Sequence, residues 1–187
     1  MGKIVLVVGG ARSGKSSFAE SYAASKGKKI AYIATAQVYD KEMEYRVKLH
    51  KSRRPSAWKT YEFPYQAEQA IVEAAKEHDM ILFDCITLYL SNLLCKENAA
   101  IDLSKDSEEV FSAFQQIVQA AKEANCTIVF VSNEVGAGIV PENALAREYR
   151  DLAGLVNQMI AREAEDVFLV TCGIPVNIKK IAENLGE

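Results

Sequence analysis

The sequence predicts an α/β protein, with a mostly parallel β-sheet and helices on both faces. Apolar runs rich in β-branched residues alternate with segments whose apolar residues recur at helical spacing. The predicted strands are apolar at nearly every position, as is typical of parallel strands that are buried on both faces. The first strand leads into a glycine-rich turn and a helix, which is the order that a phosphate-binding loop requires. We expect all 187 residues to form one domain, 1–187.

The composition excludes several classes of partner. A net charge of −3 does not favour binding to nucleic acid or to an anionic membrane surface. No apolar run approaches the roughly 20 residues of a membrane-spanning helix, and the chain opens on a core strand instead of a signal peptide. The four cysteines are scattered, so we expect reduced and mostly buried thiols, with neither a disulfide framework nor a metal site. These features together predict a cytoplasmic protein.

The first strand, residues 4–8, is followed by the motif G-x-x-x-x-G-K-S and by a helix over 17–26. Glycines allow the backbone to curl so that successive N–H groups face an anion, and the helix N-terminus adds positive potential. The lysine of the motif reaches the β- and γ-phosphates of a nucleoside triphosphate, and its serine is a ligand for Mg²⁺. The alternative is an ordinary glycine-rich turn. The motif residues are Gly9, Gly10, Ala11, Arg12, Ser13, Gly14, Lys15 and Ser16.

The next segments predict one strand and two helices. Residues 28–36 form an apolar strand that ends in small residues. Residues 40–51 form a polar helix, which must end before Pro55 because proline disfavours helical conformation in the residue before it. A loop that carries Glu62 follows, and then an amphipathic helix over 65–77.

The rest of the chain continues the alternation. Apolar runs predict strands at 80–84, 126–132 and 166–171, and a further candidate strand at 174–178. Helical spacing of apolar residues predicts helices at 86–94, 108–124 and 144–164. The polar stretch 98–107 is predicted to be a surface loop.

Polar residues stand directly after several of the predicted strands. Because the carboxyl ends of parallel strands meet at one edge of the sheet, we expect ligand-binding groups to gather there. Thr35, Asp84, Asn133 and Glu134 occupy such positions. Asp84 is predicted to hold Mg²⁺ together with Ser16, since no other predicted strand ends in an acid. The alternative for Asp84 is a cap of the helix that follows.

His50 is one of two histidines and lies in a basic segment, residues 46–54. Nearby cations favour the neutral imidazole, which is a nucleophile, and the same cations would bind a polyphosphate. The alternative is an exposed histidine on a basic helix face. His78 lies between a predicted helix and strand, where we expect it to contact the terminal carbonyls of the helix.

These motifs together resemble those of the bifunctional adenosylcobinamide kinase / adenosylcobinamide-phosphate guanylyltransferases of cobalamin biosynthesis. The resemblance covers nearly the whole chain, and its specific part is the histidine segment together with the Asn-Glu-Val-Gly block. Its pieces are Gly9–Ser16, Tyr32–Ala36, Asp40 to His50, Arg54-Pro55 and Trp58, Asp84–Thr87, Asn133–Pro141, and Arg150–Gly154 with Asn157-Gln158.

The resemblance implies two reactions. A nucleoside triphosphate, ATP or GTP, phosphorylates the aminopropanol hydroxyl of adenosylcobinamide. GTP then guanylylates a histidine, and the new phosphate of the substrate attacks this phosphoramidate to give adenosylcobinamide-GDP. His50 matches the histidine of the family motif, and Leu49 stands where some relatives have a second histidine. Lys15 is the other residue that we expect to act in catalysis.

The resemblance also implies the nucleotide contacts and the assembly. It implies a RecA-like P-loop fold, a homotrimer, and a histidine-bearing helix, about 40–52, that projects from the sheet. Beyond the P-loop, the implied nucleotide contacts are Ala34, Thr35, Ala36, His50, Lys51, Ser52, Arg53, Arg54, Glu62 and Asp84.

Two other functions compete with this one. A plain P-loop small-molecule kinase would use His50 only to bind phosphate and would form no covalent intermediate. A nucleotide-dependent switch is a different class, but the chain lacks the N-K-x-D motif with which switch GTPases recognise guanine. A RecA-like motor on nucleic acid is disfavoured by the acidic balance and by the absence of aromatic-basic stripes.

Overall fold

The computed structural model describes residues 2–37, 41, 44–45, 47–48, 51, 54–95 and 103–183. Its strands form one sheet in the order β3-β2-β4-β5-β1-β6-β7, in which β7 alone is antiparallel to its neighbour. The strands are β1 (Lys3–Gly9), β2 (Ile30–Ala34), β3 (Lys59–Glu62), β4 (Met80–Asp84), β5 (Thr127–Asn133), β6 (Asp166–Thr171) and β7 (Ile174–Asn177). The predicted mostly parallel α/β fold is confirmed.

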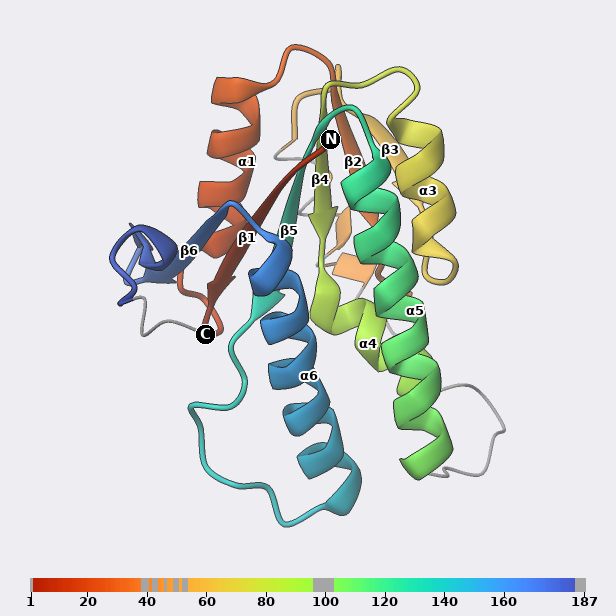
Figure 1. Ribbon diagram of the computed structural model, residues 1–187, viewed down its shortest axis with the longest axis vertical. Helices are drawn as coiled ribbons and strands as arrows, with labels where there is room; N and C mark the ends of the chain where they lie inside the picture. Colours follow the sequence, from red (N-terminus) through yellow and green to blue (C-terminus); the bar gives the residue numbers. More distant parts are fainter. Residues whose placement is uncertain are drawn as a thin grey trace.

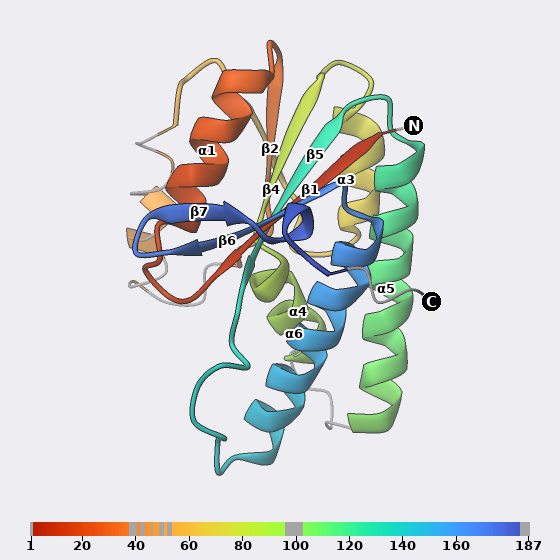
Figure 2. The same ribbon diagram turned by 60° about the vertical axis from the view of Figure 1, so that its left-hand side comes forward.

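Helices cover both faces of the sheet, but unequally (Figures 1 and 2). The described helices are α1 (Lys15–Lys26), α3 (Ala67–Ala74), α4 (Ile86–Leu94), α5 (Leu103–Glu123) and α6 (Ala144–Glu163), followed by a short 3₁₀ turn, Ile178–Lys180. Only α1 packs on one face, whereas α3, α4, α5 and α6 share the core on the other face. None of the helices in these ranges is long and apolar enough to cross a membrane.

The apolar run of β1 explains why it lies near the middle of the sheet. Alternate side chains point to opposite faces, so Ile4, Leu6 and Val8 join the core under α3 to α6. Val5 and Val7 join the core under α1. Each face therefore receives an apolar side chain at every second residue, and the strand is buried almost throughout.

Three predictions along the chain differ from the structure by more than two residues. β3 was expected to be part of a loop, because its sequence Lys-Thr-Tyr-Glu is polar. It is an edge strand that buries only Tyr61, so the apolar run that marks the central strands is missing. Helix α5 begins at Leu103, inside the predicted polar loop 98–107. Helix α3 covers Ala67–Ala74 and is shorter than the predicted 65–77.

Other predictions concern single residues and short segments. The described residues of the predicted helix 40–51 are helical. His78 lies just after α3, and its Nδ1 is 2.9 Å from the carbonyl oxygen of Ala74, as predicted. All four cysteines are free, but only Cys85 and Cys126 are buried, which is fewer than predicted.

A buried polar cluster joins the carboxyl ends of β2, β3 and β4. The Thr35 hydroxyl donates to the carbonyl of Cys85 (2.9 Å) and accepts from the N–H of Cys85 (3.0 Å). From α4, the side-chain amide of Asn92 donates to the carbonyls of Thr35 (2.7 Å) and Pro64 (3.0 Å). One helix residue therefore fixes the chain after β2 relative to the chain after β3.

The turn between β1 and α1 rests against the β6–β7 hairpin. The Gly173 N–H donates to the carbonyl of Ser13 at 2.8 Å. A Cβ atom on Gly9 would lie 2.4 Å from the carbonyl oxygen of Val170, so no larger residue fits there without a shift of the backbone. Gly14 has φ +94°, which favours glycine, and its Cα faces that of Gly173 closely.

We expect Asn92→Ala to lower the free energy of unfolding by about 2–4 kcal/mol, because it leaves two backbone carbonyls without their donor. Urea denaturation followed by circular dichroism would measure the change. The neighbouring variant Ser91→Ala is the control, and we expect it to change stability by less than about 0.5 kcal/mol. Equal stability of the two variants would contradict the role given to Asn92.

The two glycines that open the motif offer a matched pair. We expect Gly9→Ala to destabilise the fold by at least about 2 kcal/mol, because its Cβ would collide with a backbone carbonyl. A Cβ on Gly10 meets no atom within 4 Å, so we expect Gly10→Ala to stay within about 0.5 kcal/mol of the unmodified protein. Thermal unfolding of both variants without ligand would check this, and a stable Gly9→Ala protein would contradict the packing described.

Candidate functional site

The β1–α1 turn has the chemistry of an anion site. Lys15 opens α1, and its Nζ donates to the carbonyl of Gly10 across the turn at 3.1 Å. Burial lowers the pKa of Lys15, because the ammonium group is partly removed from water. A dehydrated ammonium beside the N-terminus of a helix is stabilised by an anionic ligand. The turn is therefore suited to bind phosphate groups.

Asp84 ends β4 and adds an acidic group to this edge of the sheet. Its Oδ2 accepts a hydrogen bond from the hydroxyl of Tyr32 at 2.9 Å. Its negative charge acts on the pKa of Lys15, so the two groups lie within electrostatic reach of each other. In the described part of the chain, no cluster of three or more His, Cys, Asp or Glu residues could hold a metal ion by itself. Asp84 and Ser16 supply oxygen ligands of the kind that Mg²⁺ takes when phosphates complete its coordination.

Glu62 occupies the same level of the sheet as Asp84. In the register of the sheet, Ala34 pairs with Glu62 on β3 and with Asp84 on β4. A second strand therefore ends in an acid, which corrects the expectation that only Asp84 would do so. The Nζ of Lys51 lies 2.5 Å from Oε1 of Glu62, and both side chains are about half exposed or more. Such a surface ion pair contributes little to stability and is easily exchanged for another partner.

Arg54, near the end of the basic segment, lies on the face of the Tyr32 ring. Its Cζ is 3.5 Å from the ring centroid, which is the geometry of a cation–π contact. Tyr32 is only 4% exposed, and burial raises the pKa of its hydroxyl well above the usual range. The hydroxyl therefore stays protonated and donates to Asp84.

The end of β5 lies against the phosphate-binding turn. Asn133 pairs with Gly9 in the parallel register, and the Glu134 N–H donates to the carbonyl of Gly9 at 3.1 Å. The Asn133 side-chain amide donates to the Thr87 hydroxyl at 3.3 Å, and its Oδ1 is buried with no hydrogen-bond partner among the described residues. These contacts make Asn133 and Glu134 neighbours of the turn, as the sequence predicted from the strand end.

The described candidate residues thus meet at one edge of the sheet, with two qualifications. Thr35 is fully buried and its hydroxyl bonds to the backbone of Cys85, so its side chain has a structural role in this state. His50, Ser52 and Arg53 lie outside the described residues, and their roles stay predictions.

Sequence reasoning missed two contributors to the site. Tyr32 was assigned to a strand and to a motif of the family resemblance but given no role, although a tyrosine among the apolar residues of a strand signals a buried hydroxyl that needs a partner. The β6–β7 hairpin had no local signal, because its contact with Ser13 joins segments far apart in the sequence.

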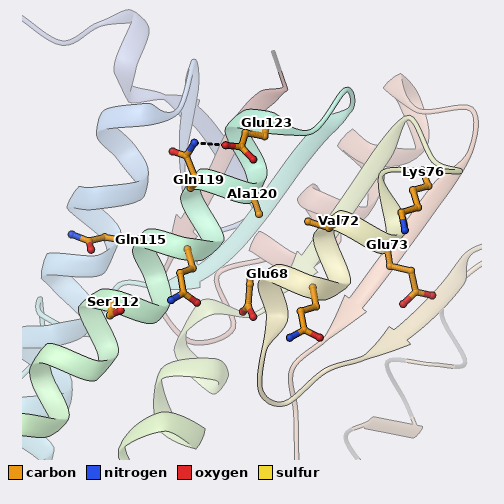
Figure 3. Close-up of a pocket in the computed structure, with 11 residues that line it drawn as sticks. Glu68, Val72, Glu73, Lys76, Ser112, Gln115, Gln119, Ala120 and Glu123 are labelled. Atoms are coloured by element: carbon orange, nitrogen blue, oxygen red, sulfur yellow. Dashed lines mark hydrogen bonds between the residues drawn. The ribbon is translucent and has the colours of Figure 1, made fainter.

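A groove lies elsewhere, between α3 and α5 (Figure 3). It has a volume of about 890 Å³ and is lined mainly by amide and acidic side chains such as Gln119 and Glu123, which hydrogen bond to each other. None of the predicted site residues lines it. Its size alone therefore does not make it the functional site.

Comparison with known proteins identifies the family. The model of the family "Cobinamide kinase / cobinamide phosphate guanyltransferase" matches residues 5–178. The bifunctional adenosylcobalamin biosynthesis protein CobU of Salmonella typhimurium (strain LT2) is 42% identical over 186 residues, covering 94% of this chain and 99% of the relative. The protein of the same name from Escherichia coli (strain K12) is 38% identical over 181 residues, with the same coverage of both chains.

A third relative agrees with this assignment, and one solved structure shares the fold. The bifunctional adenosylcobalamin biosynthesis protein CobP of Pseudomonas aeruginosa (strain PAO1) is 39% identical over 174 residues, covering 93% of this chain and 96% of the relative. A type III secretion system ATPase of pathogenic bacteria matches 95% of this chain and 58% of its own, with TM-score 0.60 at 10% identity, which supports the P-loop fold alone. The chain belongs to the cobinamide kinase / cobinamide phosphate guanyltransferase family, and it is a transferase.

Proposed function

We propose that this protein phosphorylates adenosylcobinamide and then transfers GMP from GTP to the product through a guanylylated His50, in adenosylcobalamin biosynthesis. The observation that carries the proposal is the meeting, at one sheet edge, of the phosphate-binding turn, Asp84, and the basic segment through Arg54. Membership of the family and the names of the three relatives support the pair of reactions.

In the kinase step, the aminopropanol hydroxyl of the corrinoid attacks the γ-phosphorus of ATP or GTP. The bond from the γ-phosphorus to its bridging oxygen breaks, the hydroxyl proton is released to solvent, and the nucleoside diphosphate leaves. Lys15 and the backbone N–H groups of the turn are suited to stabilise the charge that develops on the phosphates. Ser16 and Asp84 would hold Mg²⁺, which would neutralise part of that charge.

In the guanylyl step, an imidazole nitrogen of His50 attacks the α-phosphorus of GTP. The bond from the α-phosphorus to its bridging oxygen breaks, and pyrophosphate leaves with its charge held by Lys15. A phosphate oxygen of the phosphorylated corrinoid then attacks the phosphoramidate and releases His50. Each step exchanges one bond to phosphorus for another, so no oxidant or further co-substrate is required.

Two contacts of the basic segment support this role for His50. His50 directly precedes Lys51, which pairs with Glu62 at the carboxyl end of β3. Four residues after His50, Arg54 lies on Tyr32 beside Asp84. Both contacts therefore involve residues that are close to His50 in the sequence. Exchange of Lys51 from Glu62 to a phosphate would draw the segment closer.

The family resemblance further leads us to propose a cytoplasmic homotrimer. Large apolar side chains that are strongly exposed in the single chain, among them Ile139, Ile174 and Ile181, are of the kind that a neighbouring subunit covers. Figure 1 shows that the connection bearing Ile139 extends away from the sheet.

The test uses GTP labelled at the α-phosphorus, with Mg²⁺ and the purified protein. We expect covalent label that survives denaturation and alkali and is released by acid, as a phosphoramidate is. His50→Ala should abolish the label, because it removes the nucleophile. The control is His78→Ala, which removes the only other histidine, and it should keep the label.

The same preparations separate the rival functions. We expect His50→Ala to retain transfer of the γ-phosphate to adenosylcobinamide, since that step needs no histidine nucleophile. Label on His50→Ala would reject His50 as the nucleophile. No label on an unmodified protein that phosphorylates adenosylcobinamide would reject the covalent step and leave a plain kinase.

A further inference from the structure

We propose that Tyr32 is a positioning residue that couples the candidate metal site to the basic segment. Its hydroxyl fixes the carboxylate of Asp84, and its ring seats the guanidinium of Arg54. The inference rests on the proposed function, because Asp84 is assigned to Mg²⁺ there, and on the family resemblance, which implies that Arg54 contacts the nucleotide. It adds a residue to which neither reaction had given a role.

Tyr32 is held rigidly enough to position other groups. It is the middle residue of β2, paired with Thr60 on one side and with Leu82 on the other. Its side chain is 4% exposed and belongs to the core under α1. A tyrosine side chain has only two rotatable bonds, and close packing of the ring fixes both. The hydroxyl oxygen therefore has one position relative to the sheet.

That position determines how Asp84 presents its carboxylate. The hydroxyl donates to Oδ2 at 2.9 Å, so this oxygen is anchored to β2 while the backbone of Asp84 is anchored in β4. Because one carboxylate oxygen and the backbone of Asp84 are both held, the carboxylate keeps one orientation. Its second oxygen therefore points in one fixed direction. A metal ligand that is oriented before the metal arrives loses less conformational entropy on binding.

The ring of Tyr32 has a separate function. Arg54 lies 3.5 Å above the ring centroid, and this contact needs the aromatic face but not the hydroxyl. The two functions are therefore separable by substitution. Tyr32→Phe keeps the ring and removes the donor to Asp84, whereas Tyr32→Leu removes both.

The experiment measures binding without turnover. The ligand is a GTP analogue with a methylene bridge between the α- and β-phosphorus atoms, which cannot transfer GMP. Fluorescence of Trp58 reports binding, because it is the only tryptophan and packs against the same core as Tyr32. Titrations are made with excess EDTA and at increasing Mg²⁺ concentration.

We expect Tyr32→Phe to raise the Mg²⁺ concentration for half-maximal binding about tenfold, as loss of a hydrogen bond to a charged group predicts. Its Kd in EDTA should stay within about twofold of the unmodified protein. The matched control is Tyr89→Phe, which removes another buried tyrosine hydroxyl, one that accepts from the Ala67 N–H on the opposite face. This control should change neither value, although it lowers the melting temperature.

Arg54→Met, combined with each Tyr32 variant, tests the second function. We expect Arg54→Met to weaken binding in EDTA about fivefold in the unmodified and Tyr32→Phe backgrounds, because the ring is present in both. In the Tyr32→Leu background, Arg54→Met should have little effect on binding in EDTA, because the aromatic ring that the guanidinium contacts is already absent.

Three results would overturn the inference. For Tyr32→Phe, they are an unchanged Mg²⁺ requirement, or a Kd in EDTA that rises as much as the Mg²⁺ requirement does. The third is an Arg54→Met effect that is the same in all backgrounds. A tyrosine that merely fills the core would lower stability without any of the expected shifts. Failure of the proposed function is detected separately, as missing GMP label on the unmodified protein. The binding titrations do not depend on that label and can be interpreted without it.

Discussion

The site depends on a set of buried hydrogen bonds between side chains and the backbone at the carboxyl edge of the sheet. Parallel strands bring their ends to one edge, but they do not fix the chain that leaves each strand. Here Thr35 bonds to Cys85, and Asn92 bonds to the chain after β2 and after β3. Most of these polar atoms are buried, and leaving a buried one unpaired would cost the desolvation of that group. The network therefore holds one geometry.

The phosphate-binding turn and the acids then belong to one rigid frame. Glu62 and Asp84 flank Ala34 at the same level of adjacent strands. The basic segment meets this frame through contacts of a different kind, namely an exposed ion pair and a cation–π contact. These contacts are weak compared with the buried network. A rigid sheet edge beside a weakly bound segment suits a reaction in which a nucleophile must approach the nucleotide and then withdraw from it.

The sequence allowed prediction of the central strands, the phosphate-binding turn and Asp84, because each has a local pattern. β4 and β6 were predicted to the residue, since their apolar runs end abruptly. β3 was missed because an edge strand with one buried residue has no such run. The contact between Arg54 and Tyr32 was also missed, because it joins residues 22 positions apart with no shared motif. Local patterns predict elements, whereas side-chain contacts between elements need the packed fold.

The support of the phosphate-binding turn by the β6–β7 hairpin has a consequence for how the protein is made. The turn leaves the ribosome well before Val170 and Gly173, which it contacts. Both neighbours of β1, namely β5 and β6, also come from the second half of the chain. A nascent chain therefore carries its nucleotide motif long before the motif has its folded shape. The turn therefore gains its full support only after synthesis has passed Gly173.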